Sequence, residues 1–130
     1  MLMKRNDIES LGFDRALIVQ KHWCGLILDN VKTWEMRSAR TTHRGLFGLI
    51  ESGSGLIIGK ANLCDCLGAI PKEKYSEYSH MHRIYSDIDR AANWKFPWVI
   101  DNAVRFDEPV PYRHPRGAVI WVKLTDEMLA

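Results

Sequence analysis

Short apolar runs separated by polar turns dominate the pattern along the chain. Six of these runs have the length and the alternating or β-branched composition of strands: residues 16–20, 33–37, 45–50, 56–66, 98–106 and 118–124. Between two of them lies Glu51-Ser-Gly-Ser-Gly55, a sequence typical of a hairpin turn. The pattern therefore predicts one curved sheet or closed barrel built from these six segments.

Two other segments have the three- and four-residue spacing of a helix. The apolar side chains of residues 22–30 fall on one stripe, and Asn30 can end this short helix in a left-handed conformation. Residues 72–93 predict a longer helix that packs an apolar stripe on the sheet, and Tyr85 belongs to that stripe. The predicted fold class is α+β and β-dominated, a small β-barrel with a short helix after the first strand and a longer inserted helix.

Composition and charge restrict the class of protein. A chain of 130 residues that is 46% hydrophobic and 26% charged is typical of one globular domain, which excludes disordered, collagen-like and coiled-coil proteins. The net charge is only +2, so any affinity for nucleic acid must come from a local cluster. Three cysteines, an odd number, favour a reducing compartment, and no apolar run reaches the roughly 20 residues of a membrane span. We therefore expect a cytoplasmic protein that does not associate with membranes.

The densest polar cluster lies in residues 32–44. Four positive charges against one negative charge give this segment +3, from Lys32, Arg37, Arg40 and Arg44 against Glu35. Such a cluster can bind phosphates through charge and planar arginine forks, and Trp23 or Trp34 nearby can stack on a base. The same pattern also fits a solvated loop with one ion pair, because Glu35 and Arg37 point the same way along a strand.

Lys32, Glu35 and Arg37 also allow an active-site interpretation. A lysine whose pKa is lowered by burial can act as a nucleophile or base, and a carboxylate can orient it. Strict alternation places Lys32 on the face opposite Glu35, so only a turn at residues 31–33 would bring the ammonium and carboxylate groups together.

The cysteine and histidine pairs do not predict a metal site. Cys64 and Cys66 share one face of a strand, but a structural zinc ion requires four ligands. His80 and His82 lie two residues apart, whereas a helical metal pair uses a spacing of four. We expect buried cysteines, surface or capping histidines, no metal and no cofactor.

The segment Asn30-Val-Lys32-Thr-Trp-Glu35-Met-Arg37 resembles the Gly-x-Lys-x-x-Glu-x-Arg motif of the ASCH domain, a PUA-like β-barrel family. The similarity continues in residues 61–65, 101–109 and 115–117. It predicts an N-terminal extension at 1–14, an ASCH/PUA-like domain at 15–124 and a C-terminal tail at 125–130. Asn30 stands where the family has glycine, and asparagine tolerates the positive φ that such a turn needs.

The resemblance implies a cleft that receives RNA, a nucleotide or a modified nucleoside. The leading hypothesis is an RNA- or nucleotide-binding module whose binding residues are Lys32, Glu35, Arg37, Trp23, Arg40 and Arg44. Some small family members are amidohydrolases that remove the acyl group from acylated cytidine. They use a lysine at the place of Lys32 and a threonine where this chain has Glu35, so an enzyme would use Lys32 and Glu35 as catalytic residues. A third hypothesis is a protein-interaction domain of a transcription or translation regulator. The oligomeric state stays open.

Overall fold

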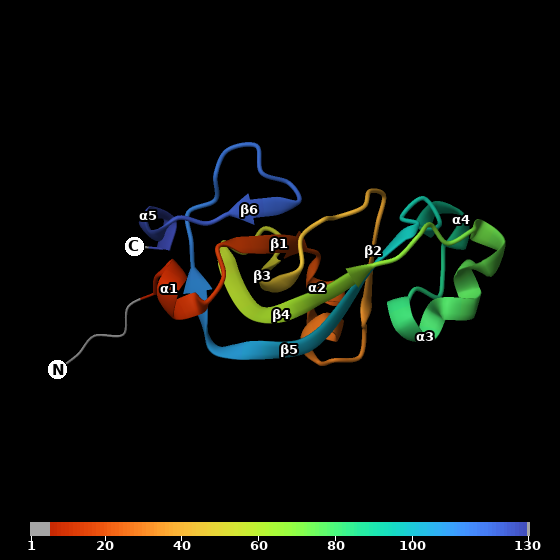
Figure 1. Cartoon of the computed structure of the whole chain (residues 1–130), viewed down its shortest axis with the longest axis horizontal. Helices are drawn as coiled ribbons and strands as arrows, with labels where there is room; N and C mark the ends of the chain where they lie inside the picture. Colours follow the sequence, from red (N-terminus) through yellow and green to blue (C-terminus); the bar gives the residue numbers. More distant parts are fainter. Residues whose placement is uncertain (1–5, 130) are drawn as a thin grey trace.

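A single six-stranded sheet with the strand order β2-β5-β4-β3-β1-β6 forms the centre of the structure, a computed structural model that describes residues 6–129 (Figure 1). Its strands are β1 (Arg15–Val19), β2 (Trp34–Arg37), β3 (Gly45–Glu51), β4 (Leu56–Cys66), β5 (Phe96–Pro111) and β6 (Trp121–Lys123). β1 pairs with β3 in parallel, and all other neighbours in the sheet pair antiparallel. Each predicted strand segment overlaps one of these strands, which confirms the β-dominated α+β fold.

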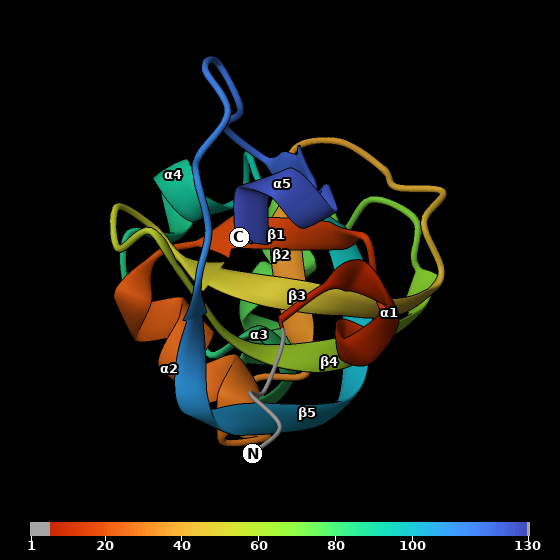
Figure 2. The ribbon, with the colours of Figure 1, turned by 90° about the vertical axis from the view of Figure 1, so that its left-hand side faces the viewer.

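Strand β5 curves the sheet into a half-barrel. It is 16 residues long and continues to Pro111, beyond the predicted end at residue 106, and it pairs with β4 along its length and with β2 at its start. The register with β4 shifts at three places, and Asn102 has a positive φ of 52°. Such irregularities bend and twist a strand. Consequently β5 wraps around one side of the sheet in both ribbon views (Figures 1 and 2).

Short helices cover the sheet and its ends: α1 (Ile8–Leu11), α2 (Lys21–Leu28), α3 (Ser79–His82), α4 (Ile88–Ala91), α5 (Asp126–Leu129) and the 3-10 helix η1 (Lys72–Tyr78). The predicted helix at residues 22–30 corresponds to α2. As expected, Asn30 follows it with a φ of 59°, and its side chain bonds both the N–H and the C=O of Ala103. Gly59 on β4 lets α2 approach the sheet, since a Cβ there would lie 2.4 Å from Leu28 Cδ2. Within residues 6–129, no helix has the length and apolar character needed to cross a membrane.

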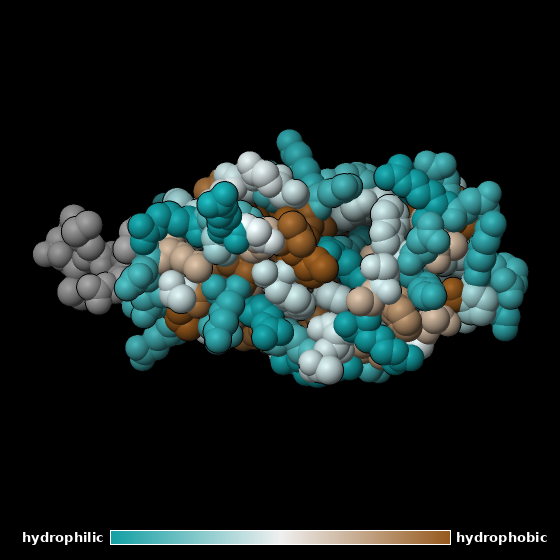
Figure 3. Space-filling view, turned by 90° about the horizontal axis from the view of Figure 1, so that it is seen from above, coloured by the Kyte–Doolittle hydropathy of each residue, from teal (hydrophilic) through white to brown (hydrophobic). Residues whose placement is uncertain are grey.

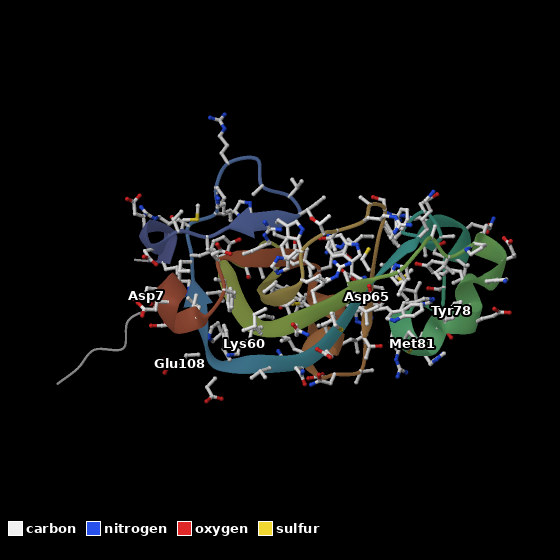
Figure 4. The ribbon with its side chains drawn as sticks, viewed as in Figure 1. Asp7, Lys60, Asp65, Tyr78, Met81 and Glu108 are labelled. Carbon is white, nitrogen blue, oxygen red and sulfur yellow. The ribbon has the colours of Figure 1, made fainter. Side chains whose placement is uncertain are left out.

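The prediction of one long helix at residues 72–93 is wrong. The segment forms η1, α3 and α4, and positive φ angles of 62° at Arg83 and 56° at Asp87 break it. Tyr75 is fully buried and Ile88 packs against the same cluster, but Tyr85 is 67% exposed, so the assignment of Tyr85 to the packed stripe is wrong. Tyr75 packs in a cluster with Trp34 rather than on the centre of the sheet. The segment thus forms the helical end of the molecule, where Figure 4 labels Tyr78 and Met81.

Three apolar clusters hold these elements together. The first lies between α2 and the sheet and includes Phe47 and Leu63, and the second lies beneath α1 and α5. Phe13 and Leu129, which flank the predicted domain at residues 15–124, are both buried in the second cluster. The third cluster joins β2 to the helical end. Helices α1 and α5 lie side by side at the opposite end of the molecule, seen face-on in Figure 2.

Candidate functional site

A cavity of about 290 Å³ lies among the ends of β1, β2 and α2 and the helical end of the molecule. Its charged lining residues are Lys32, Glu35 and Arg37, and Trp23 and Trp94 contribute to its walls. Four of the six predicted binding residues therefore meet in one place. Trp94, which the sequence pattern does not assign to the site, is 40% exposed.

The turn after α2 brings Lys32 to the face of Glu35. The backbone N–H groups of Val31 and Lys32 both donate to Leu26 O at 3.0 Å, so the chain does not yet follow the alternation of a strand. At the end of the turn, Thr33 N donates to Met81 O at 3.0 Å. As a result Lys32 Nζ lies 3.7 Å from Glu35 Oε1, the approach that the sequence allows only with a turn at residues 31–33.

Lys32 is almost completely enclosed, with 2% of its surface exposed. Its Nζ donates to His82 O at 2.6 Å and lies 4.9 Å from the centre of the Trp23 ring. Burial lowers the pKa of Lys32 from 10.5 to about 8, because the attraction of Glu35 only partly offsets the loss of hydration. The ammonium group therefore predominates at neutral pH, but the neutral amine is accessible just above it.

Glu35 and Arg37 form a tight ion pair beside Lys32. Glu35 Oε2 accepts from Arg37 Nε at 3.0 Å and from Nη2 at 2.7 Å. Nη2 also donates to Ile18 O at 2.9 Å, and the guanidinium carbon lies 5.6 Å from the Trp98 ring. Within residues 6–129, no acceptor bonds Arg37 Nη1. The arginine is thus held rigidly by protein contacts and keeps the two N–H bonds of Nη1 for a ligand.

His82 supports the site from the helical end, and the expectation of a surface or capping histidine is wrong for this residue. It is fully buried, its Nε2 donates to Tyr75 O at 2.8 Å, and its Nδ1 accepts from Ile84 N at 3.0 Å. A backbone carbonyl and a backbone amide on opposite sides require the neutral ring with its proton on Nε2. Burial also lowers the pKa of His82, which favours the same neutral form of the ring. These bonds place His82 O against Lys32.

Arg40 and Arg44, the other two predicted residues, lie outside the cavity on the connection between β2 and β3. The guanidinium of Arg40 lies 5.1 Å from the Phe96 ring. Arg44 donates to Thr41 O and His43 O and lies 3.8 Å from Asp65, which Figure 4 labels near the end of β4. The structure therefore separates the predicted set into a cavity group and an outer basic surface.

The three cysteines differ in burial, and among the described residues none belongs to a candidate metal-binding group. Cys24 is buried and Cys66 partly buried, whereas Cys64 is exposed, so the expectation of buried cysteines is wrong for Cys64. In the part of the chain that the structure describes, no group of three or more His, Cys, Asp or Glu side chains could hold a metal ion.

The cavity offers a small ligand a defined set of contacts. Arg37 Nη1 is a donor, Glu35 Oε1 is an acceptor within 3.7 Å of the Lys32 charge, and the tryptophan rings provide flat apolar surface. Its volume is close to the lower limit for ligand pockets, which suits a single ring system. A planar heterocycle that carries an amine beside an acceptor would match both the polar groups and the walls.

Comparisons with known proteins identify the fold. No protein-family model and no curated protein sequence matches the chain. Among solved structures, the chain is similar to the ASCH protein of Zymomonas mobilis, with a TM-score of 0.67 and 11% sequence identity over 88% of this chain and 89% of that chain. A Tyr-to-Phe variant of that protein gives a TM-score of 0.65 at 12% identity, with coverage of 88% and 91%, and a Ser-to-Ala variant gives 0.66 at 12%, with coverage of 88% and 89%. The chain therefore has an ASCH-type, PUA-like fold.

Proposed function

We propose that this protein binds RNA or a nucleotide and holds one base in the cavity. The observation that carries the proposal is the convergence of Lys32, Glu35 and Arg37 in a small cavity with tryptophan walls. A protein-interaction domain would require an exposed apolar patch rather than a concave polar cleft.

Each cavity residue has a distinct role in this proposal. Arg37 Nη1 donates to a ring nitrogen or carbonyl of the base, and Glu35 Oε1 accepts from its exocyclic amine. Lys32 lies 3.7 Å from Glu35 Oε1 and supplies positive charge at the back of the cavity. Trp23 stacks on the base, which is how proteins commonly bind unpaired bases of RNA.

Binding of nucleosides and nucleoside monophosphates, measured by calorimetry and by tryptophan fluorescence, tests this proposal. We expect Arg37→Gln to weaken binding about 10-fold or more, because one well-oriented hydrogen-bonding pair contributes on the order of 1–3 kcal/mol. Arg40→Gln is the matched control, since Arg40 lies outside the cavity and should leave nucleoside affinity unchanged. Equal affinities of both variants and wild type would contradict the proposal, as would the absence of binding.

The lowered pKa of Lys32 favours a second candidate function, that of an amidohydrolase that acts on an acylated nucleoside. With its pKa lowered to about 8, the Lys32 amine can take a proton from a water molecule that attacks the acyl carbon. The C–N bond then breaks, the acyl group leaves as a carboxylic acid, and the base nitrogen receives a proton from the Lys32 ammonium. Glu35, 3.7 Å away, would orient this lysine in place of the threonine that the resemblance implies.

Incubation with acylated cytidine distinguishes the two candidates. A hydrolase should release cytidine at a rate that rises with pH up to about 8 and then levels off, since the neutral form of Lys32 is the active one. Lys32→Arg should abolish this turnover while substrate still binds. A binding module should show no turnover, retain nucleotide affinity in Lys32→Arg and lose it in Lys32→Glu.

A further inference from the structure

A second hollow of about 520 Å³ adjoins the cavity. It lies between the turn that joins β3 to β4 and the loop that precedes β6, and Gly53, His114 and Ala118 are among its lining residues. Ile18, Ser52 and Val119 line both the cavity and this second hollow. The two spaces are therefore neighbouring compartments of one groove.

Backbone contacts fix the boundary between the two compartments. Ile18 N donates to Ile120 O at 2.9 Å, which places the loop before β6 beside the end of β1, and Ser52 N donates to Val19 O at 2.8 Å. Arg37 Nη2 donates to Ile18 O, so the guanidinium group of the cavity lies at this same boundary. Val119 is 75% exposed, and Figure 3 shows hydrophobic residues gathered near the middle of the face over the start of β6, beside hydrophilic ones.

The second hollow suits an uncharged ring. No Lys, Arg, Asp or Glu is among its lining residues, which include the aliphatic side chains of Ile18, Ile50 and Val119. His114 is held in place, since its Nε2 donates to Ala118 O at 2.9 Å and its Nδ1 lies 2.7 Å from the Tyr112 hydroxyl. At the boundary the positive charge comes from Arg37, and no acceptor among the described residues bonds its Nη1.

We propose that the groove binds two consecutive nucleotides of a single strand. One base occupies the cavity and accepts from one N–H of Arg37 Nη1. The neighbouring base lies in the second hollow against Val119 and His114, and the phosphate that joins the two bases accepts from the second N–H of Nη1 at the boundary. The cavity offers polar groups for the edge of one base, Arg37 offers positive charge at the boundary, and the second hollow is uncharged, which matches in that order the base, phosphate and base of a dinucleotide. The inference rests on the proposed function and makes a short RNA segment, rather than a free nucleoside, the ligand.

The affinity of dinucleoside monophosphates relative to their constituent nucleosides tests the inference by calorimetry on the full chain. We expect the best dinucleoside monophosphate to bind about 10-fold tighter than the nucleoside, the gain expected from stacking one additional base. Ala118→Glu fills the second hollow and adds negative charge, so it should remove this gain while nucleoside affinity stays unchanged. Arg116→Gln is the control, because it changes the charge of the same loop by the same amount but lies outside both lining sets.

The outcomes separate this inference from the proposed function. If nucleosides bind in a way that depends on Arg37, but dinucleoside monophosphates bind no tighter, the inference is overturned and the proposed function stands. The inference would also be overturned if Ala118→Glu and Arg116→Gln reduced the extra affinity for the dinucleoside monophosphate equally. The reduction would then come from the change in net charge and not from the filling of the second hollow. Failure of both ligands to bind wild type would overturn the proposed function itself.

Discussion

Lys32 is a cationic side chain in a place that water hardly reaches, so its charge state couples folding to pH. In the unfolded chain it binds a proton up to its ordinary pKa of 10.5, whereas in the folded protein the pKa is about 8. Between these pH values the unfolded state binds more protons, so this residue contributes increasing stability as the pH rises. Lys32→Met removes the titrating group and keeps a side chain of similar length.

We expect the free energy of unfolding of wild type, relative to Lys32→Met, to rise by up to about 3 kcal/mol between pH about 7 and about 10. Urea denaturation of both proteins across this range measures the difference. Cys24, whose pKa burial raises to about 12, lowers stability at high pH in both proteins and cancels in the comparison. Parallel pH profiles of the two proteins would show that the pKa of Lys32 is not lowered.

His82 makes the stability of the protein depend on pH on the acidic side. Because burial lowers its pKa, the unfolded chain binds more protons than the folded protein below the ordinary value of 6.5, and stability falls as the pH falls. Protonation would also break the bond from Ile84 N to Nδ1, while Lys32 and His80 add positive charge nearby.

His82→Gln should therefore flatten the loss of stability below pH 6.5, at a cost of about 1–3 kcal/mol at neutral pH from imperfect replacement of the two ring hydrogen bonds. Chemical denaturation between pH about 4.5 and about 7.5 provides the measurement. His80→Gln is the control, because His80 lies on the same short helix but is exposed. An unchanged acid profile in His82→Gln would rule out this role.

At the scale of elements, the sequence predicts strands better than the helical end. The apolar composition of residues 56–66 predicts β4, and residues Leu56 to Leu63 alternate between partly and fully buried positions in the structure. The segment 72–93 has a helical apolar stripe, but its breaks occur at Arg83 and Asp87, which are neither glycine nor proline. Tertiary contacts such as Thr33 N to Met81 O decide where this segment turns.

In the candidate site too, the sequence predicts the contacts between neighbouring residues better than those between distant segments. Asn30 and the motif residues Lys32, Glu35 and Arg37 are close in sequence, so a local turn suffices to predict that they can meet. The contact of Lys32 with His82 O spans 50 residues, and no local pattern indicates it. Trp94 reaches the cavity wall only because the helical end folds back toward β2.

Two glycines test how closely α2 packs on the sheet. A Cβ at Gly59 would lie 2.4 Å from Leu28 Cδ2 and 2.5 Å from the backbone oxygen of Val104, whereas a Cβ at Gly25 would meet nothing within 4 Å. We expect Gly59→Ala to destabilise the protein by about 1–3 kcal/mol, and Gly25→Ala, inside α2, to stabilise it by about 0.5–1 kcal/mol. Thermal and urea unfolding measure both. A neutral Gly59→Ala variant would mean that α2 packs less tightly than described.

At the scale of the whole molecule, charge is distributed unevenly in spite of a net charge of only +2. Arg40 and Arg44 lie outside the cavity on the connection between β2 and β3, and we expect a strand longer than two nucleotides to continue there. These arginines should therefore matter for oligonucleotides and not for nucleosides.

For single-stranded RNA we expect the log–log dependence of affinity on salt to flatten by about 0.7 in Arg40→Ala, because this variant neutralises one phosphate fewer than wild type. Nucleoside affinity should not change. Lys60→Ala serves as the control, since Figure 4 shows Lys60 on β4 away from Asp65, the residue that Arg44 contacts. Affinity that does not depend on salt, or an equal effect of Lys60→Ala, would contradict a phosphate-binding role for Arg40.

The arrangement of α1 and α5 determines how the molecule responds to mechanical force. Ile8 N donates to Asp126 Oδ1 at 2.8 Å, and the adjoining strands β1 and β6 run antiparallel with Arg15 opposite Lys123. Tension applied through the two helices therefore enters β1 and β6 at the same end and separates their residue pairs one after another, as in a zipper, instead of loading them together in shear. Because Val119 and Ile120 immediately precede β6, this unzipping would displace the boundary of the second hollow while β3, β4 and β5 remain paired.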